Sequence, residues 1–303
     1  MAVEPLARVD TGGDLPTLVF IHGMTFSKET WDPIVERLRD RFRCLAVDLP
    51  GHGGSTGSGA DPQTVVARIH ATVVACGVLR PVVIGHSAGA LHATGYAAAH
   101  DTAAVVNVDQ SLRVAPFAVF LRRLAPALRG PDFDTAFQPF AASIGVGRLP
   151  EPERARVLTT QHIDQQLVLD YWTRPLSESP TDLQTEIDGL LSNVTVPYLW
   201  LAGGPVDPAD RDNLTKQLPQ AQVETWSDLG HMAHLAEPDA FADRVSRFAV
   251  ESSGLYPSEI GTWARSAFQL PRAQCGLVVV PAPVDRAAEE DDEVDGANDR
   301  HDG

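Results

Sequence analysis

The sequence predicts an α/β protein whose mostly parallel, doubly wound sheet is buried on both faces. Six short runs of apolar residues are expected to form its strands, at Thr17–Ile21, Cys44–Val47, Val82–Ile84, Val105–Val108, Tyr198–Leu201 and Val223–Trp226. These runs do not alternate between apolar and polar residues, which is typical of strands covered on both faces. Helical patterns separate them, and strand–helix alternation indicates parallel strands joined by crossover helices.

Several segments between and after these strands have the character of helices. The clearest are Thr30–Arg41, Pro62–Cys76, Ala88–His100 and a final helix at Asp239–Val250. The alternation is interrupted between Ser111 and Val194, where amphipathic pieces such as Phe117–Leu128 and Glu153–Leu169 occur without a convincing strand. We therefore expect residues 1–110 and 195–250 to form the core, with 111–194 as a helical cap inserted between two strands.

The C-terminal segment differs from the rest of the chain in composition. Residues 251–303 mix Ser, Gly and Pro with isolated apolar patches, and residues 285–303 hold nine acidic and two basic side chains. We expect this extension to be mostly disordered, because it has too little apolar surface to offset the entropy of folding. Within it, Leu277–Val280 could form a loose edge strand or a partner-binding segment, although an unstructured extension is the simpler interpretation.

Charge and cysteine content argue against several classes of function. The formal net charge of −16 gives the chain no basic footprint for a nucleic acid or an anionic membrane surface. The three cysteines, Cys44, Cys76 and Cys275, are widely spaced without a CxxC pair, which argues against a disulfide framework and a zinc site. No signal peptide and no apolar run of about 18 residues is evident, so we expect a cytoplasmic protein.

The strongest indication of chemistry is the segment Gly85-His86-Ser87-Ala88-Gly89. It follows a predicted strand and precedes a predicted helix, the context in which G-x-S-x-G places a nucleophile on a tight turn. Glycine is expected at positions 85 and 89 because side chains there would clash across the turn. The turn would hold the Ser87 hydroxyl at a helix N-terminus, where developing negative charge is stabilised. Ser87 is therefore the predicted nucleophile.

A serine nucleophile needs a base and an acid that orients the base. His231 is the predicted base, because it lies in a loop after the last strand, at the carboxyl ends of the strands. His234 is its rival and is interpreted as a packing residue; the pair is not expected to bind metal, because no third ligand is close in sequence. Asp207, after the strand Tyr198–Leu201, is favoured as the acid, and Asp109, after Val105–Val108, is the alternative.

A tetrahedral oxyanion needs two backbone donors. The N–H of Ala88, directly after the nucleophile, is one candidate. The second is the N–H of Met24, in the loop after the first predicted strand, where Gly23 lets the backbone turn beneath the site. His22 in this loop is interpreted as structural. The predicted substrate pocket comprises His22, Gly23, Phe26, His86, Tyr171 and Trp172.

Together these motifs resemble the α/β-hydrolase fold superfamily in its form with a single cap insertion. The matching segments, in the order of the superfamily, are His22-Gly23 with Trp31, Asp48-Leu49-Pro50-Gly51-His52-Gly53-Gly54-Ser55, Gly85 to Gly89, Gly204 to Asp207, and Gly230 to Pro238. The resemblance covers about residues 15–250. It implies a triad of Ser87, Asp207 and His231, an oxyanion hole at Met24 and Ala88, and a helical cap over the pocket.

The sequence departs from the superfamily pattern at both ends. Only about sixteen residues precede Thr17, so one usual N-terminal strand is missing or very short. The segment after Val250 has no counterpart in the pattern.

A serine at position 87 favours acyl transfer to water, whereas an aspartate there would indicate alkyl-enzyme chemistry. We expect a hydrolase of a small apolar or aromatic carboxylic ester or lactone, without a cofactor or metal; the oligomeric state stays open. The same triad could instead cleave C–C bonds of vinylogous diketones, act as a perhydrolase, or serve a ligand receptor with slow turnover. Arg113, Arg122 and Arg123 could bind a substrate carboxylate, although solvated surface positions are the simpler interpretation.

Overall fold

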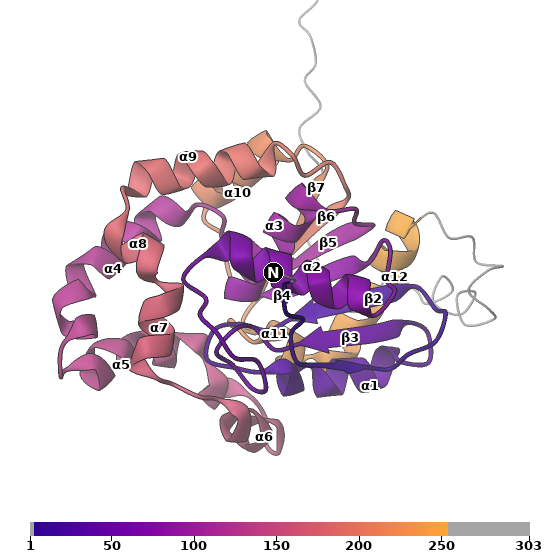
Figure 1. The fold of residues 1–303 in the computed structure, drawn as a ribbon, viewed down its shortest axis with the longest axis horizontal. Helices are drawn as coiled ribbons and strands as arrows, with labels where there is room; N and C mark the ends of the chain where they lie inside the picture. Colours follow the sequence, from indigo (N-terminus) through magenta and orange to yellow (C-terminus); the bar gives the residue numbers. More distant parts are fainter. Residues whose placement is uncertain (1–2, 254–303) are drawn as a thin grey trace, which may run out of the picture.

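The computed structural model describes residues 3–253, which form a seven-stranded sheet covered by helices (Figure 1). The strands are β1 (Arg8–Asp10), β2 (Thr17–Ile21), β3 (Arg43–Val47), β4 (Val82–His86), β5 (Ala104–Val108), β6 (Tyr198–Ala202) and β7 (Ala221–Thr225). Their order across the sheet is β1-β3-β2-β4-β5-β6-β7. All neighbours pair in parallel except β1 with β3, so the expectation of a mostly parallel sheet is confirmed.

The N-terminal strand that the sequence suggests is missing or very short is present as the short strand β1. It has three residues and pairs antiparallel with β3, with Arg8 opposite Val47 and Asp10 opposite Leu45. All three of its side chains are exposed. A segment of this length and exposure carries no apolar pattern by which a strand could be predicted.

Helices cover both faces of the sheet, because successive side chains of the central strands point to opposite faces. Leu18 and Phe20 of β2 pack with α1 (Asp32–Leu38) and α12 (Pro238–Ser253). Val19 and Ile21 face the other side, toward α2 (Pro62–Ala75), α3 (Ala88–Ala99) and α10 (Pro208–Gln217). Burial of both faces explains why these strands read as continuous apolar runs.

Between β5 and β6 the described chain contains helices and no strand, as the sequence predicts. These insertion helices are α4 (Val114–Arg129), α5 (Phe133–Ile144), α6 (Glu153–Thr160), α7 (Gln165–Tyr171), α8 (Thr173–Ser177) and α9 (Pro180–Leu191), with the 3-10 turn η2 (Val146–Arg148). They lie beside the sheet (Figure 1), and α4, α5, α7 and α8 share a core that includes Phe133, Phe137 and Trp172.

Two predicted helices are divided in the structure. The segment 153–169 forms α6 and α7, because the Asp164 carboxylate accepts a hydrogen bond from the Leu167 N–H at 2.9 Å and begins a new helix. The segment 30–41 forms the 3-10 turn η1 (Lys28–Trp31) and then α1, where Pro33 stands in the first turn. A short helix α11 (Ala233–Ala236) also precedes α12.

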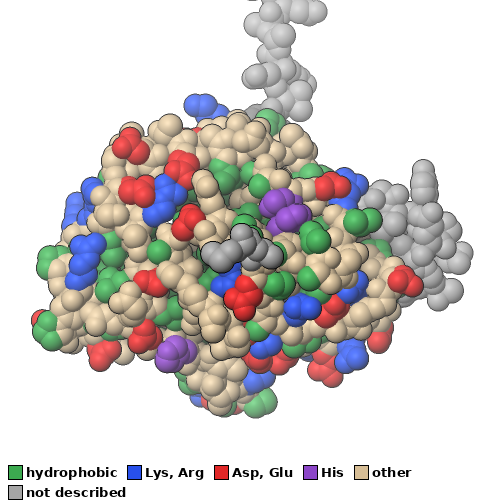
Figure 2. All heavy atoms as spheres, in the orientation of Figure 1, with side chains coloured by type: hydrophobic (Ala, Val, Ile, Leu, Met, Phe, Trp, Pro, Cys, Tyr) green, Lys and Arg blue, Asp and Glu red, His purple; other side chains and the backbone are tan. Residues whose placement is uncertain are grey.

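The surface of the described chain mixes charges of both signs, with acidic and basic side chains interspersed on the face in Figure 2. No helix of residues 3–253 is long and apolar enough to cross a membrane. The predicted extension 251–303, with its acidic run and the Leu277–Val280 segment, lies outside the described residues from position 254 onward.

Candidate active site

Ser87 occupies a tight turn between β4 and α3, as the sequence predicts. Its backbone has φ 53° and ψ −126°, a conformation that non-glycine residues rarely adopt. A Cβ at Gly85 would overlap the backbone of Gly89, and a Cβ at Gly89 would overlap the carbonyl oxygen of Ile21. Both glycines are therefore required sterically, because β4, α3 and β2 approach one another at this turn.

His231 is paired with Asp109. The two side chains approach to 2.7 Å between His231 Nδ1 and Asp109 Oδ2. Asp109 directly follows β5 and extends the sheet, since its N–H donates to the Leu201 carbonyl at 2.8 Å. Its other carboxylate oxygen, Oδ1, accepts a hydrogen bond from the Gly203 N–H at 2.8 Å. The carboxylate is thus fixed at one oxygen and presents the other to the imidazole.

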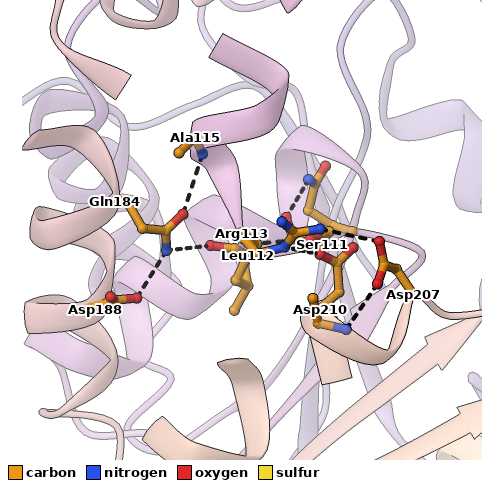
Figure 3. Close-up of polar contacts among 10 residues, drawn as sticks. Ser111, Leu112, Arg113, Ala115, Gln184, Asp188, Asp207 and Asp210 are labelled. Atoms are coloured by element: carbon orange, nitrogen blue, oxygen red, sulfur yellow. Dashed lines mark hydrogen bonds and ion pairs between the residues drawn. The ribbon is translucent and has the colours of Figure 1, made fainter. Parts of the chain in front are cut away.

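Of the two candidate acids, Asp109 contacts His231, whereas Asp207 has other partners. Asp207 is the N-cap of α10, and its carboxylate accepts from the Ala209 N–H at 2.8 Å and from Arg113 at 3.2 Å. Figure 3 shows Asp207 and Asp210 both directed at the Arg113 guanidinium. The Asp207 side chain is 56% exposed, against 23% for Asp109. Asp207 is therefore a helix cap and ion-pair partner.

The loop that carries His231 is hydrogen-bonded to the turn at Ser87, between β4 and α3. The His86 Nε2 and the His231 carbonyl oxygen form a hydrogen bond of 2.9 Å, and the two imidazole centroids lie 4.7 Å apart. On the other side, the Gly230 N–H donates to the Gly203 carbonyl at 2.8 Å. These contacts hold His231 next to the turn that carries Ser87, and both residues line one cavity.

His234, the rival base, is fully buried in the core. Its ring packs on Trp31, His86 and Phe241, with centroids 4.7, 4.6 and 5.8 Å away. Neither ring nitrogen has a hydrogen-bond partner among the described residues. This placement agrees with the interpretation of His234 as a packing residue.

Met24 and Ala88, the predicted oxyanion donors, both line the cavity beside Ser87. Within the described chain, neither backbone N–H donates a hydrogen bond. His22 holds the loop that carries Met24: its Nε2 accepts from the Leu49 N–H at 3.0 Å, and its Nδ1 bonds the Gly23 carbonyl at 2.8 Å. Both N–H groups are therefore available to a hydrogen-bond acceptor bound in the cavity.

The cavity has a volume of about 840 Å³, which suits a small-molecule ligand. Of the predicted pocket residues, Tyr171 and Trp172 line it, together with Phe117 and Phe140 of the insertion helices. His22, Gly23, Phe26 and His86 are buried and are not among the residues that line it. Sequence reasoning also missed the contributions of α2, α3 and α9. For α3, the helical spacing of the residues after Ser87 was an available signal, whereas α2 and α9 come from other parts of the chain.

The sequence profile of the alpha/beta hydrolase family matches residues 18–244, most of the described chain. The chain belongs to the alpha/beta hydrolase family. The match spans the turn at Ser87 and the loop that carries His231. Both are among the segments on which the resemblance to the superfamily rests. The match includes Ser87, Asp109 and His231.

This hydrolase is similar to curated proteins and solved structures over about four-fifths of its length. It is 29% identical over 265 residues to a pimeloyl-[acyl-carrier protein] methyl ester esterase of Stenotrophomonas maltophilia, covering 81% of this chain and 97% of that protein. It is 26% identical over 258 residues to a 2-succinyl-6-hydroxy-2,4-cyclohexadiene-1-carboxylate synthase of Yersinia pestis, covering 81% and 91%. The enol-lactonase structure from Burkholderia xenovorans shares the fold, with a TM-score of 0.62, 19% identity, and 80% and 95% coverage.

Burial keeps five histidines of the hydrolase core neutral, because it disfavours the charged imidazolium. It lowers the pKa of His52 and His92 to about 4 and that of His234 to about 3. It also lowers the pKa values of His22 and His86 well below the usual range. The site is thus surrounded by uncharged imidazoles at neutral pH.

Residues 3–253 contain no group of three or more His, Cys, Asp or Glu side chains arranged to hold a metal ion. Cys44 and Cys76 are both unpaired, and burial raises the pKa of the Cys44 thiol to about 12. The donor groups gathered at the cavity are instead a hydroxyl, an imidazole and a carboxylate.

Proposed function

We propose that this protein is a serine hydrolase that cleaves small carboxylic esters or lactones through an acyl-enzyme on Ser87. The observation that carries the proposal is the hydrogen bond of 2.7 Å between His231 and Asp109, at a cavity that His231 shares with Ser87. A serine on a strained turn beside an oriented imidazole is the arrangement that nucleophilic catalysis requires.

The Asp109 carboxylate sets the tautomer of His231. With the proton on Nδ1 donated to Asp109, the lone pair of His231 lies on Nε2, on the side of the ring away from the carboxylate. Nε2 then takes the Ser87 proton as the hydroxyl oxygen attacks the ester carbonyl carbon. The C=O electron pair moves to the oxygen, and the N–H groups of Met24 and Ala88 stabilise the resulting charge.

The tetrahedral intermediate collapses when the carbonyl re-forms and the ester C–O bond breaks. The His231 imidazolium gives its proton to the departing alkoxide, which leaves as the alcohol. Water next gives a proton to His231 and attacks the acyl carbon, and the second collapse releases the carboxylic acid and returns the proton to Ser87. In a lactone, both products remain in one molecule.

The surroundings and the relatives support ester or lactone chemistry on an apolar substrate. Phe117, Phe140 and Trp172 form an apolar wall contributed by the insertion helices, which we propose act as a cap. The similar proteins include one named as a methyl ester esterase and one named as an enol-lactonase.

The test is covalent labelling with a fluorophosphonate, followed by intact mass and peptide mapping. Stoichiometric labelling at Ser87 is expected in the native protein, and none in the Ser87→Ala variant. Ser143→Ala is the matched control, because Ser143 also lines the cavity but its hydroxyl donates to the Phe140 carbonyl. Labelling equal to that of the native protein is expected there.

Hydrolysis of short 4-nitrophenyl esters supplies the second readout. Ser87→Ala should lose about 10³-fold or more of the rate. A folded native protein that neither reacts with the fluorophosphonate nor hydrolyses these esters would overturn the proposal and favour a ligand receptor on the same scaffold.

A further inference from the structure

The cavity at Ser87 continues away from the nucleophile along one face of α3. The residues of α3 that line it are Ala88, Leu91, His92, Gly95, Ala98 and Ala99. Eleven residue steps of an α-helix, at 1.5 Å each, extend about 16 Å. The cavity therefore follows nearly the whole length of α3 from the site of chemistry.

Two further helices form the remaining walls of this stretch. The beginning of α2 contributes Pro62 and Val66, and α9 contributes Leu183, Ile187 and Leu190. Figure 1 shows α9 passing above α3, and the two helices are in contact. Because most of these lining residues are apolar and the α3 side chains are mostly small, this space suits an extended hydrocarbon chain.

The arginines of the cavity are already neutralised. Arg113 forms ion pairs with Asp207 and Asp210 (Figure 3). Arg174 forms ion pairs with Glu178 and Glu186. Among the described residues, these are the two arginines that line the cavity. A substrate carboxylate would have to displace a protein carboxylate from either of them, so the cavity favours an uncharged chain.

Among the α3 residues that line the cavity, His92 is the polar side chain. Its side chain is only 6% exposed, lines the cavity and forms no hydrogen bond with any described residue. Its pKa of about 4 keeps the imidazole neutral, with one donor and one acceptor nitrogen. The nearby Tyr171 ring meets it edge-on at 6.1 Å, but the Tyr171 hydroxyl is used by the Pro50 carbonyl at 2.9 Å.

We propose that His92 is a specificity-determining residue that hydrogen-bonds an uncharged polar group, such as a ketone or hydroxyl, within the acyl chain of the substrate. This inference rests on the proposed function, because the acyl carbon is bonded to Ser87 Oγ at the first turn of α3. His92 follows Ser87 by five residues, a rise of about 7.5 Å. An extended chain covers that rise in about six bonds, at ~1.2 Å each.

The experiment compares three 4-nitrophenyl esters that differ at the far end of the acyl chain. These are the octanoate, the 7-oxo-octanoate and the monoester of octanedioic acid. We expect the native protein to prefer the 7-oxo ester over the octanoate by about tenfold in kcat/KM, the effect of one buried hydrogen bond. The carboxylate-bearing monoester should be the slowest of the three.

Two variants of His92 separate hydrogen bonding from packing. His92→Leu removes both nitrogens and should bring the ratio of 7-oxo ester to octanoate close to one. His92→Gln keeps a donor and an acceptor and should restore part of the preference. An unchanged ratio in His92→Leu, or no preference in the native protein, would overturn the inference.

Binding to Ser87→Ala protein distinguishes failure of this inference from failure of the proposed function. Calorimetry with methyl octanoate and methyl 7-oxo-octanoate reports the role of His92 without any turnover. The 7-oxo ester should bind about tenfold more tightly, and the further His92→Leu substitution should abolish the difference. Equal binding of the two esters to Ser87→Ala protein would contradict the role of His92 even if ester hydrolysis by the native protein is confirmed.

Discussion

Replacement of Asp109 by asparagine tests the most specific feature of the proposed site. The Asp109 carboxylate accepts two hydrogen bonds, from Gly203 N–H and from the protonated Nδ1 of His231. An asparagine side chain has one oxygen and one NH₂ group in their place. If the oxygen stays with Gly203, the NH₂ group faces His231 and favours the tautomer protonated on Nε2. If the amide adopts the flipped orientation, its NH₂ group faces the Gly203 N–H. Both groups are then donors, and the hydrogen bond to Gly203 is lost.

The expected loss follows from the tautomer. An imidazole protonated on Nε2 cannot accept the Ser87 proton, so the general base is removed while its position is kept. For a triad acid replaced in this way the loss in kcat is about 10³–10⁴-fold. At 1.36 kcal/mol per factor of ten, that corresponds to about 4–5.5 kcal/mol of transition-state stabilisation. KM should change little, because Asp109 acts through His231 and not on the substrate.

Asp207→Asn is the matched control, since Asp207 is the competing acid. Its carboxylate is more than half exposed, and its ion pair with Arg113 contributes at most about 1 kcal/mol. Asparagine also serves as a helix N-cap, so α10 should be retained. We expect kcat for a 4-nitrophenyl ester to change by less than about threefold.

The assay is steady-state hydrolysis by both variants, with thermal unfolding to confirm that each is folded. A loss of 10³-fold in Asp207→Asn, or full activity in a folded Asp109→Asn protein, would refute the assignment of the acid from geometry. A similar loss in both variants would point to a shared effect on the strand ends and would equally contradict it.

Three further predictions concern packing and pH. Gly203→Ala should lower kcat for ester hydrolysis at least about tenfold, because the added Cβ collides with the Gly230 carbonyl, next to His231. Gly204→Ala is the control, and its kcat should be nearly unchanged, because the space around its Cβ is open. His234→Phe should leave the melting temperature unchanged or raise it, since it replaces two unpartnered buried nitrogens with a ring of similar shape; a fall of more than about 5 °C would contradict this. Histidines bind protons more readily in the unfolded chain than when buried in the folded protein. The free energy of unfolding should therefore fall as the pH drops from 6.5 toward 4, by about 2 kcal/mol at pH 5 for a group such as His52. Chemical denaturation at several pH values measures this slope, which would be absent if the histidines were accessible to protonation.

Much of the fold could be predicted from the sequence because it is encoded locally. The strands β2 and β4 and the helix α3 are runs of residues whose apolar content specifies their burial. The nucleophile turn is equally local, since Gly85 and Gly89 flank Ser87 within five positions. The presence of β1 could not be predicted, because its three exposed residues have no apolar pattern. This strand forms only because it pairs with the edge of β3, which is distant in sequence.

The difference between the predicted pocket residues and those that line the cavity has a related cause. His22 and His86 lie close to Ser87 in sequence or in the sheet, yet both are fully buried and neither lines the cavity. The cavity is lined instead by helices that approach α3 from distant parts of the chain, such as α9. Proximity in sequence does not reveal which face of a turn is open to a ligand.

The sequence by itself determined the strand–helix order, the turn at Ser87 and the position of His231 at the carboxyl ends of the strands. Each of these depends on residues within a few positions of one another. Only the tertiary structure shows which of Asp109 and Asp207 contacts His231, because each follows a strand and the two strands are neighbours in the sheet. The choice depends on contacts between distant segments: the Gly203 N–H holds Asp109 toward His231, 122 positions away, and Arg113 engages Asp207.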